Sequence, residues 1–168
     1  MEVDQIKLDN NSKNTEVLLA MLEHHHLKYK IDEQTPERTH VRIHFTGEDI
    51  PMTLHIILRA DRQIVSVLSA MPFYITEEHR ADACKAVAAA NQGLIDGSFD
   101  LNLKTGELRF RLTSCFIGTV LSEELYAYLM FVSAETIDRY NDRFCDLNTG
   151  HMNLDSFLQK DADDEAAG

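Results

Sequence analysis

The chain has few cysteines and no surplus of basic residues. Its three cysteines, Cys84, Cys115 and Cys145, form no C-x-x-C pair within the 168 residues. Isolated thiols of this kind indicate a reduced cytosolic protein rather than a disulfide framework or a zinc site. The formal net charge is -12, and a field of that sign repels phosphate backbones and anionic lipid surfaces. We therefore expect no nucleic acid and no membrane among its partners.

Long hydrophobic runs are also absent. Continuous apolar stretches such as residues 17–22 are far shorter than the roughly 18 residues that a membrane helix needs. The first residues show neither the basic nor the apolar region of a signal peptide. We expect a soluble, cytoplasmic protein.

Motifs for catalysis and phosphate binding are missing as well. The sequence contains no G-x-S-x-G, no G-x-x-x-x-G-K-[ST], no G-x-G-x-x-G and no H-E-x-x-H. Gly93 and Gly97 follow a predicted helix instead of preceding one, so they do not form a phosphate cradle. Asp96 and Asp100 are a carboxylate pair, but no activated nucleophile accompanies them. These absences favour a protein that is not an enzyme and has no cofactor.

What the sequence does contain is a hydrophobic period that changes along the chain. Helical spacing predicts one helix from Asn14 or Thr15 to about Leu27, and two more over residues 76–92 and 122–148. Strict alternation predicts strands between them, with a turn at Gly47-Glu48-Asp49, and a hairpin after Gly93. The order α-β-β-β(-β)-α-β-β-α indicates an α+β fold of two layers, an antiparallel β-sheet covered on one face by helices.

The ends of the chain lack this periodicity. Residues 1–13 are polar, and we expect them to form a loose lead-in. Residues 151–168 are rich in acids, which predicts a disordered tail with at most one helical turn. A single domain over residues 14–150 remains, because the length allows one hydrophobic core.

The most regular stretch covers residues 91–112. Leu103 paired with Leu108 would keep the apolar side chains of both hairpin strands on one face. Asn91 lies on the predicted buried stripe of the second helix, together with Cys84, and faces the hairpin. A buried amide has to satisfy its donors and its acceptor. We expect Asn91 to be a structural clamp between helix and hairpin.

Histidines occur in two groups. His24, His25 and His26 are consecutive on a helix, so they point about 100° apart and cannot converge on one ion. We expect His25 to lie in the buried stripe.

The second group lies on the polar face of two predicted neighbouring strands. Two interpretations stay open besides an ordinary solvated surface. His40, His44 and His55 are candidate ligands of a metal-dependent enzyme or metal sensor. Alternatively, Arg42, His44, His55 and Arg59 form a basic contact surface for a partner peptide on this acidic chain.

Ordered short motifs between residues 88 and 144 resemble a known family. They are Asn91, Gly97, Phe99, Asp100, Thr105-Gly106-Glu107, Arg109-Phe110-Arg111, Leu121-Ser122-Glu123-Glu124 and Asp138-Arg139-Tyr140. The pattern is similar to that of the YbjN family, bacterial proteins described as sensory transduction regulators. That family is similar in fold to the type III secretion chaperones, homodimers that bind other polypeptides.

The resemblance implies a homodimeric protein-binding module, chaperone-like or regulatory. It also implies a dimer contact on the alanine-rich second helix, at Ala86, Ala89 and Ala90. It supplies no catalytic residues.

Overall fold

The computed structural model describes residues 4–47 and 50–167, so the turn expected at Gly47-Glu48-Asp49 lies partly outside the described residues. One antiparallel sheet has the strand order β1-β2-β3-β4-β6-β5. Its strands are β1 (Tyr29–Gln34), β2 (Arg38–Phe45), β3 (Met52–Arg59), β4 (Ile64–Tyr74), β5 (Ser98–Leu101) and β6 (Glu107–Cys115). The helices are α1 (Gln5–His24), α2 (Arg80–Gly93), which follows the short 3-10 helix η1 (Glu77–His79), α3 (Glu123–Thr149) and α4 (Leu154–Ala167).

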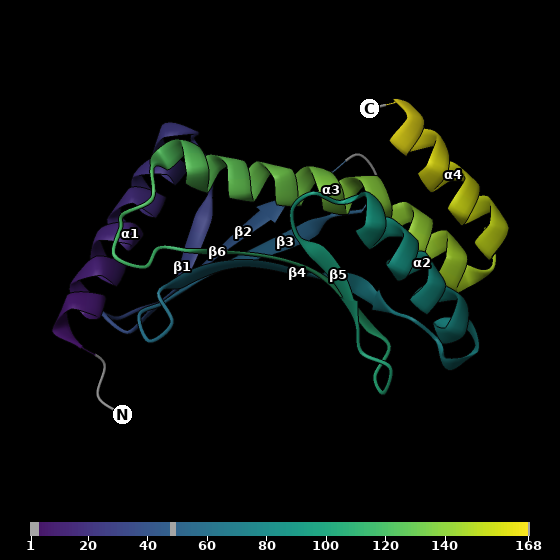
Figure 1. Ribbon diagram of the computed structural model, residues 1–168, viewed down its shortest axis with the longest axis horizontal. Helices are drawn as coiled ribbons and strands as arrows, with labels where there is room; N and C mark the ends of the chain where they lie inside the picture. Colours follow the sequence, from purple (N-terminus) through teal and green to yellow (C-terminus); the bar gives the residue numbers. More distant parts are fainter. Residues whose placement is uncertain (1–3, 48–49, 168) are drawn as a thin grey trace.

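All the helices lie on one side of the curved sheet (Figure 1). The predicted α+β fold with a one-sided antiparallel sheet is confirmed. Alternation explains it, because the odd-numbered residues of β2 and the even-numbered residues of β3 face the core and their neighbours face away. None of the helices in the described part of the chain is long and apolar enough to span a bilayer.

The first helix begins nine residues before the predicted start at Asn14, within the expected lead-in. Asp4 caps it by accepting a hydrogen bond from the amide of Ile6. Asn14 is not a cap but a fully buried residue in the middle of the helix. Its Oδ1 accepts from the amide of Leu121 and the hydroxyl of Tyr126, each at 2.9 Å. Apolar periodicity misses this part of the helix because asparagines face the core there.

The expected acidic tail contains the helix α4. Phe157 is completely buried and belongs to the hydrophobic core, and Asp161 is buried as well. Composition predicted disorder because acids dominate the segment. One aromatic side chain and paired acids nevertheless dock the helix against α2 and α3.

The buried face of α2 is rotated from the predicted one. Ala83, Ala86 and Ala90 are the buried side chains, whereas Cys84 is exposed. The prediction that Cys84 belongs to the core is wrong. Small side chains allow the backbone of α2 to pack closely on its neighbours, and a pattern read from larger apolar residues does not detect this.

The hairpin has a different register from the predicted one. Leu101, not Leu103, pairs with Leu108, and the side chain of Leu103 is 61% exposed. Asn102 ends the strand, since its Oδ1 accepts hydrogen bonds from the amides of Lys104 and Thr105. A shift of two residues keeps the same faces inward, so the hydrophobic pattern cannot distinguish the two registers.

Candidate functional site

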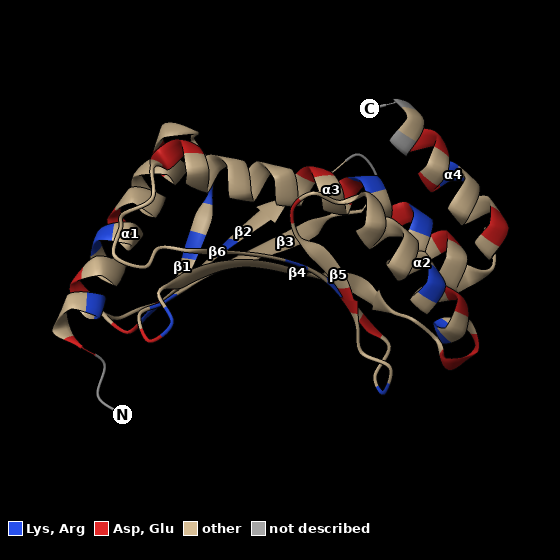
Figure 2. Cartoon of the chain, in the orientation of Figure 1, with Lys and Arg blue, Asp and Glu red and all other residues tan. Residues whose placement is uncertain are grey.

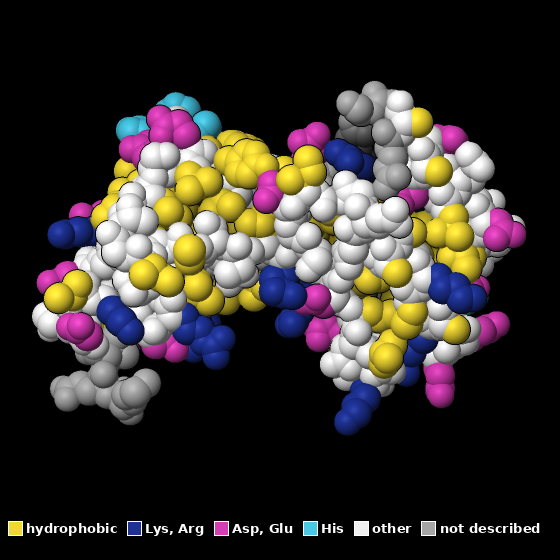
Figure 3. All heavy atoms as spheres, viewed as in Figure 1, with side chains coloured by type: hydrophobic (Ala, Val, Ile, Leu, Met, Phe, Trp, Pro, Cys, Tyr) yellow, Lys and Arg dark blue, Asp and Glu magenta, His cyan; other side chains and the backbone are white. Residues whose placement is uncertain are grey.

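The sheet face opposite the helices is the main candidate surface. Seen edge-on, the outline of this face is indented between the two ends of the molecule (lower edge in Figure 3). Lys and Arg recur along the strands of the sheet, whereas Asp and Glu gather on α4 (Figure 2). The open sheet face carries several arginines and histidines together with the apolar side chains of Ile57 and Leu68, so it differs from the rest of this acidic chain.

A pair of histidines lies near the β1 edge of the open sheet face. His40 Nε2 on β2 is 2.9 Å from His55 Nδ1 on β3. Asp32 of β1 lies beside them, with Oδ2 3.9 Å from His40 Nε2 and Oδ1 2.8 Å from Arg42 Nη2. A bulge in β1 between Ile31 and Glu33 breaks the alternation of the strand at Asp32. The open sheet face thus has an imidazole pair beside an ion pair.

The charges of this cluster shift two pKa values. Burial lowers the pKa of His55 below its usual value, and the nearby charges of His40 and Arg42 act in the same direction. Burial alone would raise the pKa of Asp32, but the hydrogen bond and charge of Arg42 outweigh it and lower that pKa. Near neutral pH, Asp32 is therefore a carboxylate and His55 a neutral imidazole.

Arginines also line the other end of the open sheet face. Arg111 Nε on β6 is 2.9 Å from Asp100 Oδ2 on β5, and Arg109 Nε is 3.6 Å from the same oxygen. The hydrogen bond from Arg111 lowers the pKa of Asp100. Half-buried Ile57 and Leu68 lie between the two charged ends, since Leu68 pairs with both His55 and Arg111.

The structure brings only some of the predicted residues together. His40 and His55 meet, while His44 Nδ1 is 2.9 Å from the hydroxyl of Thr53. Arg59 donates to Asp61 in the following turn. Over residues 4–47 and 50–167, no group of three or more His, Cys, Asp and Glu side chains could hold a metal ion. His40 and His55 thus form a pair, and His44 does not join them as a third ligand.

Other candidates have local partners. Asp96 accepts a hydrogen bond from the hydroxyl of Tyr128, and Asp100 from Arg111, so each carboxylate has its own partner. His25 is exposed and packs edge-on against Phe131 with ring centroids 5.2 Å apart, so the prediction that it is buried is wrong.

Asn91 contacts the hairpin as expected. Its Nδ2 donates to the carbonyl oxygen of Phe99 at 3.0 Å, and its Oδ1 accepts from the amide of Phe99 at 2.7 Å. The two bonds join the last turn of α2 to β5.

The expected dimer contact is mostly inaccessible. Ala86 and Ala90 have no exposed surface in the single chain, and Ala89 is half-buried. These residues pack α2 within its own domain, so a contact between two chains at Ala86 and Ala90 is contradicted.

Sequence reasoning missed Asp32, because the β1 bulge that turns it toward His40 and Arg42 cannot be read from the sequence.

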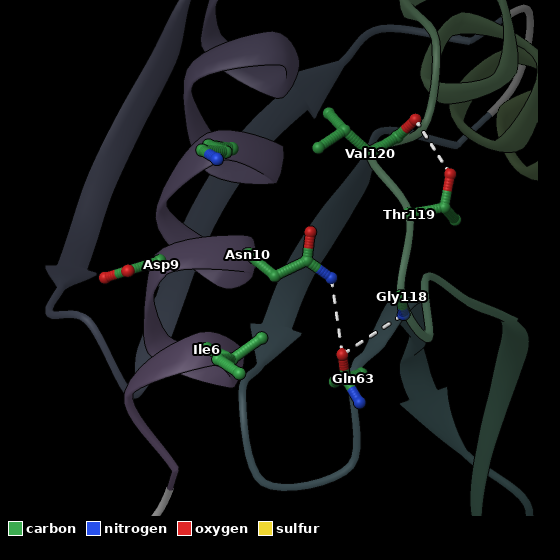
Figure 4. Close-up of a pocket in the computed structure, with 8 residues that line it drawn as sticks. Ile6, Asp9, Asn10, Gln63, Gly118, Thr119 and Val120 are labelled. Carbon is green, nitrogen blue, oxygen red and sulfur yellow. Dashed lines mark hydrogen bonds between the residues drawn. The ribbon is translucent and has the colours of Figure 1, made fainter.

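Sequence reasoning also missed a pocket of about 500 Å³ between α1 and the loops around Gln63 and Gly118 (Figure 4). There Asn10 Nδ2 donates to Gln63 Oε1 at 3.3 Å and to the carbonyl of Phe116 at 2.9 Å. Those contacts hold the start of α1 against the loops, which is a structural role.

Comparison with protein-family models matches residues 14–146 to YbjN, described as "Putative bacterial sensory transduction regulator". The matched region runs from the middle of α1 almost to the end of α3 and contains the whole sheet. A search of curated proteins found no match.

Proposed function

Because the chain belongs to the YbjN family, we propose that it is a non-enzymatic regulatory protein that binds a polypeptide. It acts as a homodimer in the bacterial cytoplasm, and the open sheet face is its binding surface. The three cysteines, all free thiols, suit a reducing compartment.

The observation that carries this proposal is the composition of the open sheet face. Arg42 lies on one side of the apolar centre of Ile57 and Leu68, and Arg109 and Arg111 lie on the other, on a chain whose net charge is -12. A concave surface with an apolar centre and charged edges suits an extended or helical peptide. The basic edge favours acidic side chains in that peptide, because complementary charge selects the partner.

A photo-crosslinking amino acid at Ser66, on the open sheet face, tests the proposal. The same group at Glu16, exposed on α1, is the matched control. In bacterial cells we expect a cross-linked polypeptide from Ser66 and none from Glu16, with the attachment point identified by mass spectrometry.

Charge reversal tests whether the arginines matter. Arg42→Glu should reduce the cross-linking yield from Ser66 about tenfold, because one attraction becomes a repulsion. Lys104→Glu, at the exposed tip of the hairpin, should leave the yield unchanged. Equal yields from Ser66 and Glu16, or no response to Arg42→Glu, would contradict the proposal.

The homodimer needs an exposed apolar surface other than the alanines of α2. Tyr128 and Phe131 are 48% and 41% exposed on the outer side of α3. Ile95 is also exposed, and it directly precedes Asp96, which accepts a hydrogen bond from the hydroxyl of Tyr128. We assign the contact between chains to this α3 patch, defined as Tyr128, Phe131 and Ile95, because exposed aromatic residues are enriched at protein interfaces.

A further inference from the structure

The last helix packs against α2 and the end of α3 (Figure 1), and we call the surface that it covers the α2–α3 groove. Its main contact is Phe157, whose ring centroid lies 5.1 Å from that of Phe144 and 6.4 Å from that of Tyr140. Among the described side chains of α4, only Phe157 and Asp161 are buried. The helix is thus held at a few points along one face.

Two acids complete the contact of α4 with the groove. The hydroxyl of Tyr140 donates a hydrogen bond to Asp161, and Arg143 donates one to Asp164. Phe157, Asp161 and Asp164 follow one another at i, i+4 and i+7, so they share a single helix face. The groove therefore recognises a helix that carries an aromatic residue followed by acids four and seven positions later.

Arg143 has more binding capacity than α4 uses. Its side chain is only 8% exposed and its guanidinium lies 5.2 Å from the centre of the Tyr140 ring. Nη2 bonds to Asp164, but Nη1 is buried with no hydrogen-bond partner among the described residues. A buried donor without an acceptor is costly. A helix that offers a second acceptor to Nη1 would therefore fit the groove better than α4 does.

Two observations distinguish α4 from the rest of the domain: the extent of the family match and the short connection between α3 and α4. The match to YbjN ends at residue 146, before α4, although it includes Tyr140 and Arg143 on the groove side. Only residues 150–153 separate α3 from α4, and Gly150 adopts a left-handed conformation there. The groove belongs to the family domain, whereas its occupant lies outside the matched region.

We propose that the α2–α3 groove is a second polypeptide-binding site, distinct from the open sheet face. Its ligand is an amphipathic helix of a partner protein with one aromatic residue, acids at the fourth and seventh following positions and a further acceptor that reaches Arg143 Nη1. In the free chain α4 fills the groove and competes with that ligand, so binding requires displacement of α4.

A labelled synthetic peptide of residues 151–168 serves as the probe, and fluorescence anisotropy measures its binding to the full-length chain. The wild-type chain should bind little peptide, because its own α4 is tethered at a high effective concentration. The Phe157→Ala chain should bind it, because its own helix has lost its main contact. A peptide with the same substitution should bind that chain about a hundredfold more weakly.

Leu158→Ala is the matched control chain, since this neighbouring side chain is partly exposed, and it should bind no more peptide than the wild type. If the Phe157→Ala chain does not melt cooperatively, the double variant Asp161→Asn, Asp164→Asn takes its place in the binding experiment. That variant keeps every apolar side chain of the hydrophobic core. A folded variant chain that fails to bind the peptide, or a wild-type chain that binds it equally well, would overturn the proposal.

Discussion

At the scale of single residues, Asn91 is a direct test of how α2 is attached to the hairpin. Asn91→Ala removes both hydrogen bonds to Phe99 and leaves the amide and carbonyl of a buried residue without these partners. We expect the free energy of unfolding to fall by about 2–3 kcal/mol, measured by urea denaturation. Gln92→Ala, at the exposed neighbouring position, should change it by less than about 0.5 kcal/mol. Equal effects of the two substitutions would show that Asn91 is no clamp.

His55 should make stability depend on pH. Its pKa in the folded protein is lowered by burial, then by His40 and Arg42. The folded state therefore binds fewer protons than the unfolded state, so stability increases with pH across this window. The stabilisation is fully present above the unfolded value of about 6.5 and is lost as the pH falls below it.

The variant His55→Gln isolates this effect. It should flatten the loss of melting temperature between about pH 7 and pH 5. His26→Gln, an exposed histidine outside the sheet, is the control for removing a histidine. If His55→Gln retains the full wild-type dependence on pH in this range, His55 is not the group responsible.

At the scale of elements, two glycines share the same left-handed backbone conformation but differ in how closely other atoms approach them. Substitutions at the two positions therefore separate the cost of backbone strain from the cost of a steric clash. Gly106 in the hairpin and Gly150 after α3 have φ values of 79° and 78°. A Cβ at Gly106 would lie 2.1 Å from the carbonyl oxygen of Ile75, whereas a Cβ at Gly150 would meet no atom within 4 Å. The hairpin thus packs directly against the backbone that follows β4.

Alanine at each glycine should have a different cost. Gly150→Ala should destabilise the protein by about 1 kcal/mol, the cost of a left-handed alanine. Gly106→Ala should cost at least about 3 kcal/mol, because the clash also disturbs the 2.8 Å hydrogen bond from the Ile75 amide to the Gly106 carbonyl. Thermal melts of both variants measure the difference, and equal shifts would contradict a tight hairpin contact.

The elements differ in how far the sequence predicts them. Alternation identified β2 and β3 because their polar and apolar residues separate cleanly, and it placed His40 and His55 on one face. The start of α1 was missed since Asn11 and Asn14 are buried polar residues. The docking of α4 depends on its hydrogen bonds with Tyr140 and Arg143. These bonds join residues that are far apart in the sequence, so no local pattern predicts them.

At the scale of the whole molecule, the candidate surfaces lie on different sides. The open sheet face is on the side away from the helices, while α3 lies in the helical layer (Figure 1). Contact between two chains through the α3 patch would therefore leave both open sheet faces accessible. A two-fold interface brings the same patch of each chain together, so Phe131 of one chain would lie close to the same aromatic region of the other.

This arrangement predicts a solution mass of two chains in sedimentation experiments. Phe131→Glu should shift the mass to that of one chain, because two such carboxylates would be buried near each other in a symmetric contact. Leu103→Glu is the matched control, since this side chain is also exposed but lies at the tip of the hairpin. It should leave the two-chain mass unchanged. A wild-type mass of one chain would contradict the dimer, and a two-chain mass for Phe131→Glu would place the contact elsewhere on the surface.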